Sequence, residues 1–86
     1  MTQRAIPRSL LYTPALTLER VMKAHSYDAD MHVIDLEDAV PLAAKPAARA
    51  ICRTALEQLP TAANVCVRVN ALSTMEAVHD LAMLAG

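Results

Sequence analysis

Three acidic side chains, Asp35, Glu37 and Asp38, lie within four consecutive positions of the sequence. They follow the β-branched residues Val33 and Ile34, which predict a β-strand that ends in a cluster of carboxylates. Carboxylates at this spacing repel one another and are costly to remove from water, so a counter-charge, a metal ion or ordered water must offset that cost. A strand that only packs against a core does not need such an ending, and the cluster is the first candidate for a functional site.

A second polar pair, Arg68 and Asn70, ends the next predicted strand, 64–70. The two residues share one side of that strand by the period of two, as Asp35 and Glu37 share one side of theirs. Neighbouring strands lie about 4.8 Å apart, so Arg68 can face either Glu37 or the carboxylate of a ligand. A guanidinium group binds a carboxylate through two parallel hydrogen bonds, which suits substrate binding. An ion pair that only stabilises the fold is the alternative.

The pattern of apolar residues predicts three strands that alternate with three helices. The strands are expected at 9–13, 31–37 and 64–70. The first helix is expected to begin at Leu18, the second to run over 46–59, and the third to follow Ser73. This alternation predicts an α/β fold of three βα units with parallel strands and right-handed crossovers. Ligands bind at the carboxyl ends of the strands in such folds, which is where the acidic cluster and Arg68 fall.

The starts of two helices and the buried face of one can be predicted in more detail. Thr17 is expected to cap the first helix, and Ser73 with Glu76 forms the signature of a capping box for the last helix. The last helix is expected to bury its apolar residues, which are Ala77, Val78, Leu81, Ala82 and Ala85.

Two cations precede or begin the helix at 46–59. Lys45 and Arg49 are spaced four apart, and they either belong to a solvated charged face or neutralise Glu37 and Asp38. The remaining candidates for chemistry favour structural roles. His25 is expected to pack as a neutral side chain, and His32, at the start of a strand, to be structural. His79 is expected to be solvated, and Cys52 and Cys66 to be free buried thiols.

The composition excludes several classes of protein. The chain has 86 residues, of which 55% are hydrophobic and 20% charged, so it predicts one small globular domain. The chain has two tyrosines and neither phenylalanine nor tryptophan, so the core must be aliphatic. A net charge of −1 gives no electrostatic basis for binding nucleic acid or an anionic membrane. No apolar run approaches the roughly 20 residues of a membrane span and no signal peptide is evident, so we expect a cytoplasmic protein.

Four segments together resemble the HpcH/HpaI aldolase and citrate lyase superfamily, in particular its citrate lyase β-subunit and malyl-CoA lyase group. They extend over nearly the whole chain, in the order 8–14, 35–41, 45–49 and 67–70. The resemblance implies the first part of a TIM (β/α)8 barrel, and a full barrel of this kind takes about 250 residues. We therefore expect residues 1–86 to form a single partial domain, the N-terminal part of a lyase.

The resemblance also implies an activity and roles for three residues. It implies Mg²⁺-dependent cleavage or formation of a carbon–carbon bond in citryl-, malyl- or citramalyl-type acyl thioesters, or in related hydroxy and keto acids. Arg68 then corresponds to the residue that binds the substrate carboxylate. Glu37 and Asp38 correspond to catalytic carboxylates beside the waters of the metal ion. The residues that bind the metal directly belong to later strands, which this sequence does not contain.

Residues 15–19 depart from the family, because they lack the basic residues that accompany the thioester cofactor. A free acid or a carrier-bound acyl group is therefore an alternative to CoA. Three functions are compatible with the sequence: a lyase that acts within a full barrel, a non-catalytic truncated homologue that serves as an interaction or regulatory partner of such a barrel, and a small domain whose ion pairs are only structural. An isolated three-stranded sheet leaves two edges unpaired, so we expect association into a homo-oligomer or with a larger partner.

Overall fold

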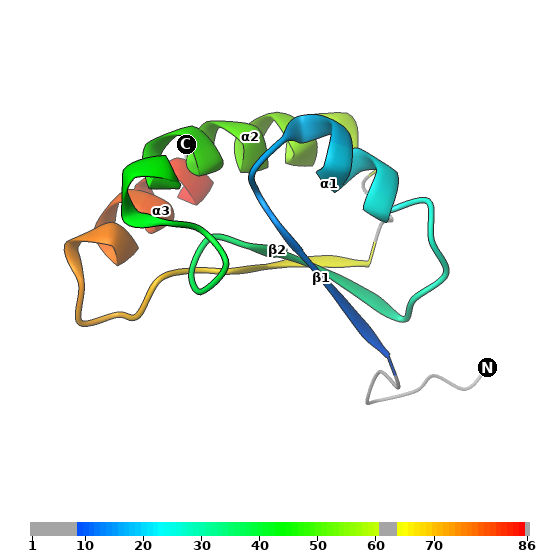
Figure 1. Ribbon diagram of the computed structural model, residues 1–86, viewed down its shortest axis with the longest axis horizontal. Coiled ribbons are helices and arrows are strands. Elements are labelled where there is room, and N and C mark those ends of the chain that lie inside the picture. Colours follow the sequence, from blue (N-terminus) through cyan, green and yellow to red (C-terminus); the bar gives the residue numbers. More distant parts are fainter. Residues whose placement is uncertain (1–8, 61–63, 86) are drawn as a thin grey trace.

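The computed structural model describes residues 9–60 and 64–85, which form a parallel three-stranded sheet covered by helices on one face (Figure 1). The strands are β1 (Leu10–Pro14), β2 (Met31–Asp35) and β3 (Val65–Arg68), in the order β1-β2-β3. The helices are α1 (Leu18–Ala24), α2 (Lys45–Gln58) and α3 (Met75–Ala85), and a short 3-10 turn, η1 (Leu42–Ala44), precedes α2. The predicted alternation of strand and helix and the parallel pairing are confirmed.

The register of the sheet aligns the ends of all three strands. Pro14 lies opposite Asp35, and Asp35 lies opposite Arg68. Strands β2 and β3 each end two residues earlier than the alternating pattern predicts. After β2 the chain turns because the Asp35 carboxylate accepts hydrogen bonds from the amides of Glu37 and Ala39. The period of two therefore stops at Asp35, and it does not govern the loop that follows.

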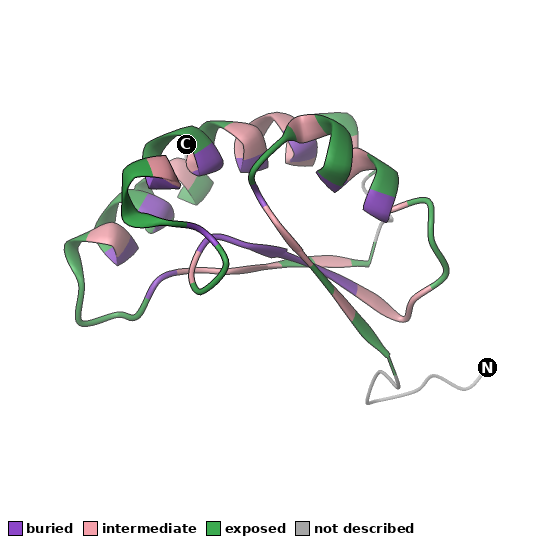
Figure 2. Ribbon diagram, in the orientation of Figure 1, coloured by how far each residue is buried: buried purple, intermediate pink, exposed green. Residues whose placement is uncertain are grey.

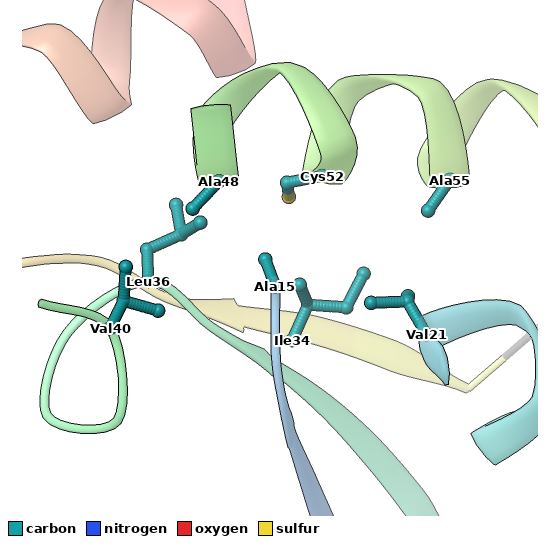
Figure 3. Close-up of a cluster of buried hydrophobic side chains, with 8 residues drawn as sticks. All are labelled: Ala15, Val21, Ile34, Leu36, Val40, Ala48, Cys52 and Ala55. Atoms are coloured by element: carbon teal, nitrogen blue, oxygen red, sulfur yellow. The ribbon is translucent and has the colours of Figure 1, made fainter. Parts of the chain in front are cut away.

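The core lies between the sheet and the helices and is aliphatic, as predicted (Figure 3). Ile34 and Leu36 project from β2 and its end toward α2, while Val21 reaches the same cluster from α1. Small residues form the inner side of α2, which lets the helix approach the sheet closely. The buried cluster consists of Ala15, Val21, Ile34, Leu36, Val40, Ala48, Cys52 and Ala55.

The start of α1 confirms the prediction, whereas the start of α3 does not. Thr17 caps α1, since its Oγ1 accepts a hydrogen bond from the amide of Arg20 at 3.2 Å. At α3 the corresponding acceptor is Thr74, whose Oγ1 lies 3.3 Å from the amide nitrogen of Ala77. The predicted capping box at Ser73 is therefore wrong by one residue.

The buried face of α3 also differs from the prediction (Figure 2). Ala77 and Asp80 are buried, but Val78 and Leu81 are 55% and 50% exposed. An acidic residue thus takes the place that the apolar pattern assigned to leucine and valine. The helix is thus rotated relative to the prediction, and an apolar strip along α3 and the loop before it is exposed. The strip consists of Leu72, Met75, Val78, Leu81 and Leu84. No helix within the described parts of the chain is long and apolar enough to cross a membrane.

The two cysteines occupy opposite environments, so the expectation that both are buried is wrong for one of them. Cys52 is fully buried on α2, and burial together with the nearby Asp80 carboxylate raises its pKa to about 11. Cys66 is exposed on β3, because alternation along the strand points it away from the helices that cover Val65 and Val67.

This difference predicts selective alkylation. At pH 8, iodoacetamide should modify Cys66 at least about 100-fold faster than Cys52, since the thiolate is the reactive form and Cys52 is both protonated and inaccessible. Mass spectrometry of the native chain should find one modified thiol, and the Cys66→Ser variant should stay unmodified until denaturant is added. Equal rates at the two thiols in the native protein would contradict the placement of Cys52 in the core.

Candidate functional site

The carboxyl end of the sheet is organised by an ion pair between Asp35 and Arg68. Register places the two residues opposite each other, at the ends of β2 and β3. The Nε and Nη2 atoms of Arg68 donate to the two oxygens of Asp35 at 3.0 and 2.8 Å. Asp35 is only 2% exposed, whereas the Arg68 side chain is 37% exposed. The buried carboxylate therefore holds a guanidinium group that remains accessible.

The same carboxylate shapes the loop that carries the other two acidic residues. The amide of Glu37 donates to Asp35 Oδ1 at 2.8 Å, and the amide of Ala39 lies 3.3 Å from Oδ2. Val40 is buried in the core and donates through its amide to the Glu37 carbonyl at 3.1 Å. The loop is thus fixed at both ends, which leaves the side chain of Asp38 at its exposed tip.

Glu37 and Asp38 flank the guanidinium group without hydrogen bonding to it. Glu37 Oε1 lies 3.8 Å from Arg68 Nε, and Asp38 Oδ2 lies 3.8 Å from Nη1. Their side chains are 30% and 75% exposed. The structure therefore brings all three predicted site residues together, and it shows that Asp35 rather than Glu37 is the closest partner of Arg68.

The charges of the central pair stabilise each other. Burial acts to raise the pKa of Asp35, but the hydrogen bonds from Arg68 and from the amides of Glu37 and Ala39 outweigh it and lower that pKa below its usual value. The hydrogen bond to Asp35 raises the pKa of Arg68, against the effect of its own burial. Both groups are consequently charged throughout the neutral range.

Tyr12 of β1 completes the support of the guanidinium group. The Cζ atom of Arg68 lies 5.0 Å from the centroid of the Tyr12 ring, within the range of a cation–π interaction. Sequence reasoning missed this residue. The available signal was the period of two, because Tyr12 and Pro14 alternate onto the same face of the sheet as Asp35.

Lys45 has neither of the roles that the sequence predicted. Its side chain is buried, and its Nζ donates to the carbonyls of Leu36 and Glu37 at 2.9 and 3.0 Å. It therefore holds the backbone of the acidic loop, and it is neither a solvated cation nor paired directly with a carboxylate.

Behind the loop lies a buried polar network that sequence reasoning also missed. Asp80 is fully buried on α3, and its Oδ2 accepts hydrogen bonds from the backbone amide and the side chain of Asn70, both at 2.7 Å. Its Oδ1 lies 3.2 Å from Nη1 of Arg49, which also donates to Glu76 at 2.9 Å. Asn70 thus contacts α3 and does not share a side with Arg68, and Arg49 pairs with α3 and not with the acidic loop. An aspartate inside an apolar helix was the available signal.

These groups do not form a metal centre by themselves. Within residues 9–60 and 64–85, no cluster of three or more His, Cys, Asp and Glu side chains could hold a metal ion. Both oxygens of Asp35 already accept hydrogen bonds from protein groups. Glu37 and Asp38 are the carboxylates here that can still contact water molecules around a metal bound by other residues.

The ion pair predicts a large effect of Asp35→Ala on stability. The substitution leaves the amides of Glu37 and Ala39 without their acceptor and Arg68 without its main partner, so the free energy of unfolding should fall by about 1–3 kcal/mol at pH 7. The matched variant Asp38→Ala, at the exposed tip of the same loop, should cost less than about 1 kcal/mol. Urea unfolding followed by circular dichroism, at one fixed protein concentration, measures both.

The same variant predicts a pH dependence. A lowered carboxyl pKa stabilises the folded state above the unfolded value of 3.8, and this contribution is lost as the pH falls through the folded-state pKa. The stability difference between the native chain and Asp35→Ala should therefore shrink below about pH 4. A difference that is constant from pH 7 to pH 2.5 would contradict the charged state of this pair.

Comparison with known proteins relates this site to a family. A family model described as HpcH/HpaI aldolase/citrate lyase matches residues 8–86. A citrate lyase subunit beta-like protein of Mycobacterium tuberculosis is 42% identical over 87 residues, which cover 100% of this chain and 30% of that protein. Citrate lyase subunit beta of Escherichia coli K12 is 39% identical over 75 residues, 86% of this chain and 25% of that subunit. The chain thus spans about a third or less of the length of these relatives.

Solved structures agree with the sequence comparison. The citrate lyase beta subunit of M. tuberculosis complexed with oxaloacetate and magnesium superposes with a TM-score of 0.78 at 39% identity, covering 95% of this chain and 35% of that one. CitE of M. tuberculosis in complex with magnesium, acetoacetate and coenzyme A gives a TM-score of 0.79 at 39% identity, covering 98% and 30%. The three βα units match part of these TIM barrels, and the chain belongs to the HpcH/HpaI aldolase/citrate lyase family.

Proposed function

We propose that this chain supplies the first three βα units of a Mg²⁺-dependent carbon–carbon lyase, and that Arg68 binds the carboxylate of its substrate. The observation that carries the proposal is the guanidinium group itself, which Asp35 and Tyr12 hold at the carboxyl end of the sheet. Alternation along β3 places Arg68 on the same side as Cys66, away from the helices. Relatives in complex with oxaloacetate or acetoacetate and magnesium support a keto acid or an acyl thioester as the ligand.

Arg68 has donor capacity left for a ligand. Its Nε and Nη2 atoms donate to Asp35, but Nη1 lies 3.8 Å from Asp38, which is beyond hydrogen-bond length. A substrate carboxylate can accept from Nη1 while Asp35 keeps the guanidinium plane in place. Asp35 is then a positioning residue, and the ion pair and substrate binding are compatible.

Glu37 and Asp38 are proposed to contact the water molecules of the magnesium ion. Glu37 is half-buried and Asp38 is exposed, and both carboxylates lie next to Arg68. Mg²⁺ keeps several waters when it is bound by few protein groups. When bound, the metal polarises the keto oxygen and stabilises the enolate that forms when the carbon–carbon bond breaks. Its direct ligands are expected on strands beyond those of this sequence.

Two observations bear on the acyl carrier of the proposed substrate. A relative binds coenzyme A, which supports citryl-, malyl- or citramalyl-CoA as substrates. Residues 15–19, which connect β1 to α1 and form the start of that helix, lack basic side chains for the phosphates of such a cofactor. A carrier-bound acyl group or a free hydroxy acid remains the alternative.

A second candidate function rests on the surfaces of the chain. The sheet has two edge strands, β1 and β3, and the apolar strip along α3 is exposed. Such surfaces favour association, either into a homo-oligomer or with a complete barrel of the same family. In that case the chain is a non-catalytic partner of a full-length homologue.

A chimaera tests the role of Arg68. Residues 1–86 replace the matching segment of the M. tuberculosis relative, whose remaining strands complete the barrel, and calorimetry measures oxaloacetate binding in the presence of Mg²⁺. Arg68→Ala should weaken binding roughly 100-fold, about 2.7 kcal/mol, because a charge-assisted contact is lost. Arg68→Lys should recover little of it, since lysine lacks the planar fork.

The exposed Arg20→Ala serves as the matched control and should bind normally. Unchanged binding by Arg68→Ala would refute the substrate-binding role. A folded chimaera that binds no oxaloacetate, with Arg68 intact, would favour the non-catalytic alternative.

The chain by itself is expected to bind no Mg²⁺ tightly, to catalyse nothing and to associate. The described residues hold no metal cluster, and two unpaired sheet edges with an apolar strip make a monomer marginal. Analytical ultracentrifugation should show a dimer or larger species, and calorimetry should show no micromolar Mg²⁺ binding. A well-folded monomer that binds Mg²⁺ at micromolar concentration would overturn this expectation.

A further inference from the structure

Two histidines pack against each other at the amino end of the sheet, whereas the acidic loop lies at its carboxyl end. His25 is the C-cap residue of α1, and His32 lies on β2 with 8% of its surface exposed. Their ring centroids are 4.5 Å apart, at an interplanar angle of 31°. The contact joins the end of the helix to the strand that follows it in the sequence.

Each ring has a buried nitrogen atom that forms no hydrogen bond within the described residues, Nε2 in His25 and Nδ1 in His32. Buried polar atoms are nearly always paired, and an unpaired one costs about 1–3 kcal/mol, so two in contacting rings require an explanation. The His25 Nδ1 atom lies 2.9 Å from the Val21 carbonyl, which can only accept. We therefore assign the ring proton of His25 to Nδ1, which leaves Nε2 with a lone pair that can accept a proton.

The surroundings decide how the pair responds to acid. Burial lowers the pKa of His32 and the neighbouring His25 lowers it further, while a backbone hydrogen bond at Tyr27 and the carboxylate of Asp28 act in the opposite direction. The neighbours of His32 on the adjacent strands are Leu11 and Val65, which carry no charge. Protonation of both rings would place two positive charges in a poorly hydrated site, on rings whose centroids are 4.5 Å apart.

We propose that His25 and His32 form an acid-sensitive latch, which fastens the end of α1 and the connection 25–30 to β2 when both rings are neutral and releases them when His32 takes up a proton. A charged ring must be hydrated, and hydration at this position requires the contact between the rings to open. Because His32 lies near the start of β2 and Asp35 is at its end, the device is independent of the proposed lyase site.

The sign of the effect follows from linkage. The unfolded chain binds a proton at His32 near its ordinary pKa of 6.5, whereas the folded chain binds it only at lower pH. Stability is therefore fully present above that value and declines as the pH falls below it. The contribution of Asp35 changes only below about pH 4, so the two transitions are separate.

Hydrogen–deuterium exchange of the full chain tests the latch directly. Between pH 7.5 and pH 5.5, after correction for intrinsic rates, amides in 21–32 should become about 10-fold less protected, while those in the middle of α2 change little. His32→Phe keeps an aromatic ring and should remove most of this pH dependence. The matched control His79→Gln removes an exposed imidazole from α3 and should retain it.

A histidine NMR titration of the native chain keeps the proposal testable if His32→Phe does not fold. The His32 ring should take up its proton below the ordinary pKa of histidine, and the backbone signals of 21–32 should move over the same pH range. Titration of His32 without movement of those backbone signals, together with unchanged protection in 21–32 at pH 5.5, would overturn the latch. A His79→Gln variant that lost the pH dependence would overturn it as well.

Discussion

The carboxyl end of this sheet depends on one buried carboxylate. Asp35 accepts hydrogen bonds from two nitrogen atoms of Arg68 and from the amides of Glu37 and Ala39. A charge buried in this way is tolerated only when it is paired and fully hydrogen bonded. Satisfying Asp35 therefore ends the strand, closes the loop and orients the arginine at once. As a consequence, the carboxylates of Glu37 and Asp38 lie beside the guanidinium group of Arg68.

The back of the loop obeys a similar constraint. Lys45 and Asn70 both donate to the carbonyl of Leu36, and Asn70 continues to the buried Asp80 on α3. Arg49 supplies the cation that compensates Asp80. This network fixes how α3 is rotated, and the apolar strip of that helix is left exposed because polar pairing, rather than apolar area, determines its buried side. Because this apolar surface is exposed, we expect the chain to associate with another copy of itself or with a complete barrel.

Local patterns predicted much of this structure. The order of elements, the parallel pairing, the cap at Thr17 and the aliphatic core follow from periodicity, propensity and composition. The convergence of Glu37, Asp38 and Arg68 follows from their positions at strand ends. The apolar patterns failed where polar side chains compete with them. Asp35 accepts hydrogen bonds from two amides and ends β2, and Asp80 takes the buried position on α3 in place of Val78 and Leu81. The ion pair joins Asp35 to Arg68, which are 33 positions apart in the sequence, and no local period can predict such a contact.

The most direct test of the central claim is a crystal structure of the chimaera with Mg²⁺ and oxaloacetate. The account predicts that the ligand carboxylate accepts a hydrogen bond from Nη1 of Arg68, that Asp35 keeps both of its bonds to the same side chain, and that Glu37 and Asp38 contact the waters of the metal ion. A ligand bound with its carboxylate away from Arg68, while the arginine contacts only Asp35, would contradict it and leave the ion pair with a structural role alone.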